Sequence, residues 1–250
     1  MTSPWPSRLW IVRHGQSAGN VARDHAHAAG LGQIDLDIRD VDVPLSALGH
    51  EQSEALGKWF SALPEHERPT VVLTSTYLRA RQTADAIAEA GGLATPDVAF
   101  CTDERLRERE FGVLDRLTTQ GIEARYPDQA EARRRLGKFY HRPPGGESWC
   151  DVILRLRAAL DTLSLHHRDE RVLIVGHQVV VLCLRYLLEG LTETEILAID
   201  AEGDVANCGV TAYSRSADGG LTLDVYNFVA PLQAEGAPVT SAPDAKVAAR

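Results

Sequence analysis

Residues 9–16 read Leu9-Trp10-Ile11-Val12-Arg13-His14-Gly15-Gln16. The four apolar residues that open this stretch predict a short buried strand, and Gly15 marks the turn that ends it. A histidine at the carboxyl end of such a strand, beside an arginine, suits a group that must meet an anion. These residues also have an ordinary explanation, because many strands end in a polar residue. Partners for His14 must therefore come from elsewhere in the chain.

Two later segments repeat the pattern of an apolar strand followed by a basic side chain. The predicted strand 70–74 precedes a helix from about residue 77 to 90, which carries Arg79 in its first turn. Helix N-termini favour acidic side chains by a few tenths to about 1 kcal/mol. Arg79 at that position therefore indicates a bound anion shared with the free N–H groups of the helix. The predicted strand 171–176 delivers His177 directly before an apolar helix.

The order of the predicted elements indicates the fold class. Strands alternate with helices through most of the chain, which predicts an α/β fold, a three-layer α/β/α sandwich with a mainly parallel central sheet. A terminal hairpin is expected to turn at residues 218–220. Ligands of such sheets bind beyond the carboxyl ends of the strands. His14, Arg79 and His177 should then converge on one pocket, and together they predict a phosphate site.

The domain organisation follows from composition and from breaks in the pattern. We expect one domain over residues 1–230, with a helical cap insertion at 117–146 that is broken at Tyr126-Pro127. Residues 231–250 are rich in Ala and Pro and hold few large apolar residues, which predicts a disordered tail. The cap carries several basic residues, which form either a solvated helix face or a site for a second anionic group of a substrate. These are Arg133, Arg134, Arg135 and Lys138.

Composition and charge narrow the class of protein. The chain has 250 residues, of which 44% are hydrophobic and 24% charged, and its formal net charge of -9 argues against a general nucleic-acid binder. The four cysteines are scattered, so neither a zinc site nor a disulfide framework is indicated. No apolar run approaches the roughly 20 residues that a membrane-spanning helix needs, and the N-terminus lacks a signal peptide. We expect a cytoplasmic protein without a nucleic-acid or membrane partner.

The chain resembles the histidine phosphatase superfamily, which includes the cofactor-dependent phosphoglycerate mutases and the acid phosphatases. The resemblance covers about residues 8–229 and rests on many motifs in the same order. The matching positions are Arg13 to Ser17 with Asn20, Pro44-Leu45-Ser46 with Gly49 and Gln52, Thr74-Ser75 with Arg79-Ala80 and Gln82-Thr83-Ala84, Leu106-Arg107-Glu108 with Phe111-Gly112, Gly146-Glu147-Ser148, Val175-Gly176-His177, and Asn207.

The resemblance implies a role for each residue of the core site. His14 is the nucleophile that becomes transiently phosphorylated, and Glu108 is the general acid. Arg13, Arg79 and His177 bind the phosphoryl oxygens. Chemically, His14 must be neutral, and a backbone carbonyl should hold the proton of its second ring nitrogen. To act as an acid near so many cations, Glu108 must be partly desolvated, or the charge of the phosphate dianion must raise its pKa again.

The resemblance also implies how the substrate is bound. Gly15, Gln16, Ser17, Asn20 and the backbone around Gln178 match positions that contact the substrate. No metal and no cofactor are implied, because two arginines and a histidine neutralise the phosphoryl charge. The expected partner is a small phosphorylated substrate. The oligomeric state is open, and a homodimer is compatible with the sequence.

Departures from the mutase pattern favour hydrolysis. Gln16 stands where a mutase normally carries Glu, and Gln178-Val179-Val180 replaces Gly-Asn-Ser. The resulting prediction is a phosphomonoesterase that acts on a small phosphorylated metabolite through phosphohistidine. The alternatives are phosphoglycerate mutase-type transfer and, from another class, a catalytically silent binding module. The complete set of five core residues argues against a silent module.

Overall fold

The structure is a computed structural model that describes residues 3–241. Its centre is a six-stranded sheet of order β3-β2-β4-β1-β5-β6. The strands are β1 Arg8–Arg13, β2 Val71–Thr74, β3 Ala99–Thr102, β4 Arg171–Gly176, β5 Val210–Arg215 and β6 Leu221–Phe228. β1, β2, β3 and β4 run parallel, whereas β5 is antiparallel both to β1 and to its hairpin partner β6. The predicted mainly parallel sheet with a terminal hairpin is confirmed.

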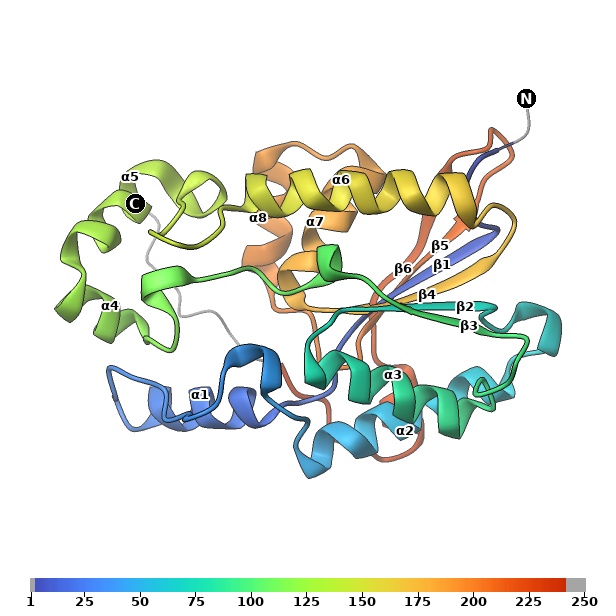
Figure 1. Cartoon of the computed structure of the whole chain (residues 1–250), viewed down its shortest axis with the longest axis horizontal. Coiled ribbons are helices and arrows are strands. Elements are labelled where there is room, and N and C mark those ends of the chain that lie inside the picture. The colour runs from blue at the N-terminus through green and yellow to red at the C-terminus, as the bar shows by residue number, and fades with distance from the viewer. Residues whose placement is uncertain (1–2, 242–250) are drawn as a thin grey trace.

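Helices cover both faces of the sheet, which confirms the predicted three layers (Figure 1). Alternate residues of β1 enter two separate cores, because successive side chains of a strand point to opposite faces. Leu9 and Ile11 join one core, and Trp10 and Val12 join the other. One face carries α2 Ala47–Ala62, α3 Leu78–Gly91 and α9 Ala230–Ala234, and the other carries α6 Trp149–His166, α7 Gln178–Glu189 and α8 Glu193–Glu202.

Capping residues determine where several of these helices begin and end. The hydroxyl of Ser46 accepts the N–H of Gly49 at 3.0 Å and starts α2, as its position before an apolar stripe predicts. Ser148 caps α6 in the same way. Gly92, with φ of 64°, ends α3 in the left-handed conformation that favours glycine. These local signals fix the directions in which the helices leave the sheet.

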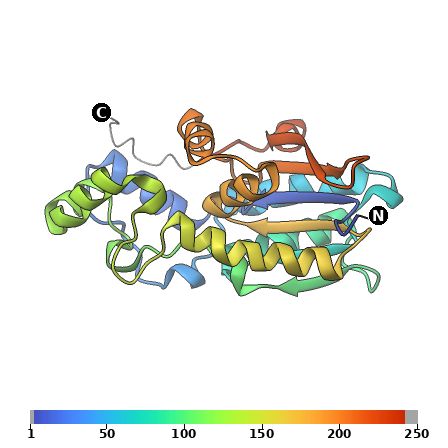
Figure 2. The same cartoon turned by 90° about the horizontal axis from the view of Figure 1, so that it is seen from above.

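Three helices lie beyond the carboxyl ends of the parallel strands. They are α1 Ala18–Ala28, α4 Thr119–Arg125 and α5 Pro127–Tyr140, and both views place them together at that end of the sheet (Figures 1 and 2). Gln33, after α1, forms a bridge with Leu117, before α4. The backbones of Gly32 and Gly121 lie so close that a Cβ on Gly121 would fall 1.7 Å from the Gly32 oxygen. The predicted break at Tyr126-Pro127 is confirmed, and the segment forms two helices there.

Short 3-10 turns connect the larger elements. Three of them, η1 Asp40–Asp42, η3 Glu104–Leu106 and η4 Gly112–Leu114, lie near the same end of the sheet, whereas η2 Glu65–Glu67 precedes β2 at the opposite end. Within residues 3–241, no helix is both long and apolar enough to cross a membrane.

The segment after β6 corrects the sequence-based expectation. Residues 231–241 were expected to be disordered, but α9 packs against α2 with Leu232 fully buried. The amide of Gln52 donates to the carbonyl of Pro238 at 2.8 Å, and the backbone N–H of Asn207 donates to the carbonyl of Thr240 at 2.8 Å. The burial of Pro231 and Leu232, together with these hydrogen bonds, orders a segment whose composition alone predicts disorder. The expectation for residues 242–250 lies outside the described residues.

Candidate active site

The turn that follows β1 is held by close backbone packing against α2. A Cβ on Gly15 would lie 2.5 Å from the carbonyl oxygen of Gly49, and a Cβ on Gly49 would lie 2.0 Å from that of Gln16. Both positions therefore require glycine. The N–H groups of Gly15 and Gln16 donate to Thr83 Oγ1 and Gln52 Oε1. This packing fixes the backbone that carries His14.

His14 is buried at the carboxyl end of β1, with its ring set in one tautomer. Its Nδ1 lies 2.7 Å from the carbonyl oxygen of Gly15. A carbonyl oxygen only accepts hydrogen bonds, so Nδ1 carries the proton and Nε2 keeps its lone pair. Burial, and then the charges of Arg79 and Arg13, hold the pKa of His14 well below its usual range. The predicted contact of the ring with a backbone carbonyl is present, and the lowered pKa favours the predicted neutral imidazole.

His177 follows β4 and faces His14 from the neighbouring strand. The two ring centroids are 5.2 Å apart, with an angle of 63° between the ring planes. Nε2 of His177 lies 2.8 Å from the hydroxyl of Ser75, whose oxygen also accepts the Tyr77 N–H. Nδ1 of His177 is buried without a hydrogen-bond partner among the described residues, and it carries the ring proton in the tautomer whose Nε2 accepts the Ser75 hydroxyl. Burial and the charge of Arg79 lower the pKa of His177.

Two guanidinium groups near His14 also carry buried N–H groups without a partner in residues 3–241. These are Nε of Arg13 and both Nε and Nη2 of Arg23. Arg13 donates through Nη1 to the carbonyl of Val205, whereas Arg23 on α1 lies 4.0 Å from Asp24. Burial, and next the like charge of Arg23, lower the pKa of Arg13 to about 10. An anion between the two guanidiniums would satisfy these donors and relieve the repulsion.

Arg79 lies at the start of α3, as predicted, but its partner is part of the protein. The sequence predicts an external anion there, whereas the carboxylate of Asp40 accepts hydrogen bonds from Nη1 at 2.9 Å and from Nη2 at 3.2 Å. The guanidinium also lies over the ring of Tyr77, with Cζ 4.9 Å from its centroid. Tyr77 in turn packs against His177, with ring centroids 5.1 Å apart.

Glu108 lies between η3 and η4, where the charged groups of the site act on the pKa of its side chain. Its Oε1 accepts the N–H of Arg109 at 2.8 Å. Burial is the largest influence and raises the pKa of Glu108, although the charges of Arg79 and Arg13 oppose it. The negative charge of Asp40 adds to the rise. Partial desolvation is one of the two ways in which the sequence allows this acid to keep its proton, and the burial of Glu108 supports it.

The remaining predicted residues are mostly engaged within the protein. Gln16 accepts the hydroxyl hydrogen of Ser46 at 2.7 Å, and Gln178 donates to Asp204 at 2.7 Å. Ser17 and Asn20 form the capping box that starts α1. Asn207 donates to the carbonyl of His14 at 2.9 Å and, at 3.4 Å, to Oδ1 of Asn20. These contacts support the loop around His14, and their part in binding a substrate stays a prediction.

The basic residues of the predicted cap mostly pair with acidic neighbours. Arg134 and Arg135 both contact Glu131 on the exposed face of α5, as the helical spacing predicts. Lys138 contacts Asp200 at 2.6 Å. These pairs favour the solvated-face interpretation for Arg134 and Arg135. Arg81 on α3 is exposed, as predicted for a solvated arginine.

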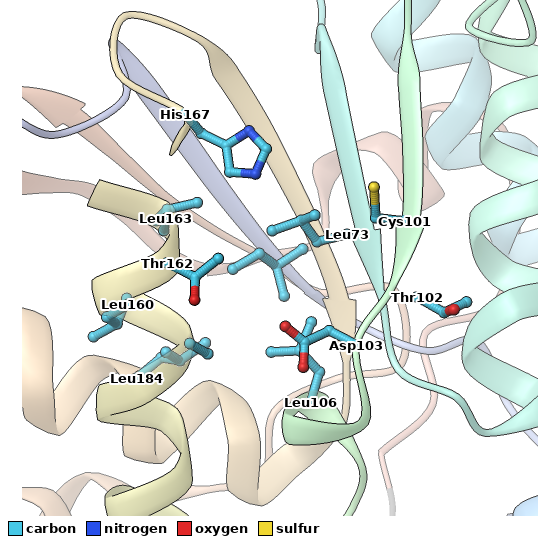
Figure 3. Close-up of a pocket in the computed structure, with 12 residues that line it drawn as sticks. Leu73, Cys101, Thr102, Asp103, Leu106, Leu160, Thr162, Leu163, His167 and Leu184 are labelled. Atoms are coloured by element: carbon cyan, nitrogen blue, oxygen red, sulfur yellow. The ribbon is translucent and has the colours of Figure 1, made fainter. Parts of the chain in front are cut away.

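A separate apolar cavity lies between α6 and the strands β2 and β3 (Figure 3). Leu160 and Leu163 line it from α6, and Leu73 lines it from β2. Asp103, at its polar edge, is paired with Arg105 at 2.6 Å. None of the residues that line this cavity belongs to the cluster around His14. Its apolar lining does not suit a phosphate.

Together, the site joins a neutral imidazole with a free lone pair to a set of buried, unpartnered N–H donors. The N-terminus of α7, with His177 as its N-cap, adds the positive end of a helix dipole. Sequence reasoning missed Arg23, Tyr77 and Asp40. The i,i+3 spacing of Asn20 and Arg23 was a usable signal, because it places both on one face of α1. Asp40 lies in a segment without periodicity, so the sequence carries no comparable signal.

Comparisons with known proteins agree with this arrangement. The profile of the histidine phosphatase superfamily (branch 1) matches residues 9–228. A probable phosphoglycerate mutase, GpmB, of Yersinia enterocolitica is 32% identical over 186 residues, which cover 74% of this chain and 75% of the relative. The fructose-2,6-bisphosphatase of Saccharomyces cerevisiae is 31% identical over 181 residues, which cover 72% of this chain and 34% of the relative.

A solved structure gives the same architecture. The mycobacterial glucosyl-3-phosphoglycerate phosphatase in complex with VO3 has a TM-score of 0.65 and 27% identity. The match covers 88% of this chain and 99% of that chain. The relatives thus include both mutases and phosphatases.

Proposed function

Because the chain belongs to the histidine phosphatase superfamily, we propose that it is a phosphomonoesterase that hydrolyses a small phosphorylated metabolite through a phosphohistidine at His14. The observation that carries this proposal is the state of His14. Its ring is neutral, its Nδ1 proton is bound by the Gly15 carbonyl, and its Nε2 lone pair is left to attack. A nucleophile in this state needs no base to activate it.

In the first step, Nε2 of His14 forms a bond to phosphorus as the bond to the ester oxygen breaks. The phosphoryl charge spreads over its equatorial oxygens, which Arg13, Arg79 and Nδ1 of His177 bind. Glu108 donates its proton to the leaving oxygen, so the product departs as a neutral alcohol. In the second step, a water attacks the phosphohistidine, Glu108 takes a proton from that water, and His14 leaves neutral.

Arg23 adds a further guanidinium to this scheme. Its Nε and Nη2 are buried without a hydrogen-bond partner in residues 3–241, and its charge acts more strongly on Arg13 than that of Arg79 does. Its effect on His14 is smaller than that of Arg79 or of Arg13. Arg23 therefore fits an anionic group of the substrate that lies on the α1 side of the reacting phosphoryl group.

Phosphoryl transfer of the mutase type is the second candidate, because several relatives carry the name of a phosphoglycerate mutase or a probable one. Hydrolysis is favoured by Gln16, whose Oε1 is bound by Ser46. It is also favoured by the exposed pairing of Arg134 and Arg135 with Glu131, since a mutase needs arginines free to hold its acid substrate.

Phosphate release from an aryl phosphate tests the proposal. The wild type should turn over, and His14→Ala should be inactive. No turnover by the wild type, or undiminished turnover by His14→Ala, would contradict it. Interconversion of phosphoglycerates that outpaces hydrolysis would instead establish the mutase.

A further inference from the structure

The side chain of Arg79 is gripped by Asp40, a residue outside the motifs that identify the superfamily here. Nη1 of Arg79 donates to Oδ1 of Asp40 at 2.9 Å and to its carbonyl oxygen at 2.7 Å. Nη2 donates to Oδ2 at 3.2 Å. Arg79 is 5% exposed, so this pair is shielded from solvent on the arginine side. A bidentate pair of this kind fixes both the position and the plane of the guanidinium.

The ion pair with Asp40 occupies one end of the Arg79 guanidinium and leaves its adjacent edge available for a ligand. Three of its five N–H groups bind Asp40. The other two, on Nε and Nη2, lie parallel along the adjacent edge. Two parallel N–H groups match two oxygens of a phosphoryl group. The ring of Tyr77 covers one face of the same guanidinium, with Cζ 4.9 Å from the ring centroid.

Asp40 also contributes negative charge beside the proposed general acid. Arg13, Arg79 and the N–H of Arg109 each lower the pKa of Glu108, whereas burial and the charge of Asp40 raise it. Asp40 is the negative side chain that offsets these cations at Glu108. Arg155 of α6 donates to the backbone carbonyl of Glu108 at 3.3 Å, and Cys183 of α7 lies close enough for the charge of Glu108 to add to the rise that burial causes in the pKa of its thiol.

We propose that Asp40 is a positioning residue of this site, which holds Arg79 so that its Nε–Nη2 edge receives two oxygens of the phosphoryl group. The inference rests on the proposed phosphatase function. The grip exists before any substrate binds, so the donors need no rearrangement at the moment of reaction. The charge of Asp40 also helps Glu108 to keep the proton that it must donate.

The opposite role is that of an internal competitor. If Asp40 occupied the place of a phosphoryl oxygen, the substrate would have to displace it from Arg79. The two roles predict opposite effects on phosphate affinity. Removing a positioning residue weakens phosphate binding, whereas removing a competitor strengthens it.

The variant Asp40→Asn tests this assignment, with Asp42→Asn as the matched control. Asp42 lies in the same turn, η1, and its carboxylate accepts Nε of the exposed Arg39 at 2.7 Å. For Asp40→Asn we expect kcat/KM for an aryl phosphate to fall about 10- to 100-fold, as for a misplaced catalytic group. We also expect the dissociation constant of inorganic phosphate to rise, and the basic limb of the pH profile to move to lower pH. Asp42→Asn should match the wild type in all three.

A rescue variant separates positioning from folding. Asp40→Glu keeps the charge, so it should return the basic limb to higher pH, and thermal unfolding of each variant checks that it is folded. Wild-type kinetics and pH profile in Asp40→Asn would overturn the inference, as would tighter phosphate binding. Failure of the proposed function is recognised separately, because then the wild type itself would not turn over, or His14→Ala would match it.

Discussion

The imidazole rings of His14 and His177 lie 5.2 Å apart, centroid to centroid, on two adjacent parallel strands. The register of β1 and β4 pairs Arg13 with Gly176, so both histidines leave the sheet at the same level. Nε2 of His14 is left free by the Gly15 carbonyl contact, and Nδ1 of His177 has no hydrogen-bond partner in residues 3–241. The geometry of the sheet thus places the free nitrogen of His14 next to the ring of His177, whose Nδ1 is available for a ligand.

Glu108→Gln tests the assignment of the general acid. The pKa of Glu108 is raised above its usual value by burial, so the acid form persists to higher pH and is lost as pH rises through that pKa. The wild type should therefore lose activity along a basic limb that Glu108→Gln lacks. General acids typically contribute about 10²- to 10⁴-fold. The loss should be larger for an alkyl phosphate, whose leaving group needs the proton, than for an aryl phosphate.

The exposed Glu104, in the turn just before Glu108, provides the control for this variant. Glu104→Gln should keep the wild-type pH profile. An equal loss with alkyl and aryl phosphates in Glu108→Gln would argue that Glu108 does not protonate the leaving group.

Arg23→Met should weaken substrate binding without lowering the unfolding free energy. Its Nε and Nη2 are buried without a hydrogen-bond partner among the described residues, and its charge opposes that of Arg13. Removing it should leave the unfolding free energy unchanged or raise it. Hydrogen bonds to charged groups are worth about 1.5–3 kcal/mol, so the affinity for a phosphomonoester with a second anionic group should fall roughly 10- to 100-fold.

In Arg23→Met, the affinity for a simple aryl phosphate should fall much less than the affinity for a doubly anionic substrate. Arg81→Met removes an exposed arginine of α3 and should change neither binding nor stability. A marked drop in stability of Arg23→Met, with binding unaltered, would make Arg23 a structural residue.

Gly49→Ala should displace the turn that carries His14. Its Cβ would lie 2.0 Å from the carbonyl oxygen of Gln16, so backbone must move. Overpacking of this kind costs about 1–3 kcal/mol of unfolding free energy, and kcat/KM should fall with it. Gly203→Ala is the matched control, because nothing lies within 4 Å of its Cβ position. Denaturant unfolding of both variants measures the difference, and equal stabilities would show that the turn is not constrained by α2.

Acid should destabilise the protein through its buried histidines. The pKa values of His14 and His177 are both lowered by burial and by neighbouring arginines, whereas an unfolded histidine titrates near 6.5. The unfolded state therefore binds more protons as pH falls below about 6.5, and the unfolding free energy should decline there. The unfolding free energy of His177→Asn should decline less steeply with falling pH than that of the wild type. His66→Asn changes an exposed residue and should decline as steeply as the wild type. Parallel pH–stability curves for wild type and His177→Asn would contradict the account.

Much of the fold was predictable because the chain marks its elements locally. Apolar runs such as 171–176 predict buried strands, and Ser46 and Gly92 mark helix ends. The grip of Asp40 on Arg79 was not predictable, because a carboxylate in an irregular segment carries no periodic signal. Order in residues 231–241 was missed for a similar reason, since it depends on the burial of Pro231 and Leu232 and on distant hydrogen bonds.

The central claim is that the phosphoryl group passes through His14, and trapping that intermediate tests it most directly. The protein is mixed with an excess of aryl phosphate, quenched in alkali within milliseconds, and digested for mass spectrometry. We predict an acid-labile phosphoryl group on the peptide that contains His14, and none on the peptide that contains His177. Continued turnover with an unmodified His14, or a phosphoryl group on another residue, would contradict the account.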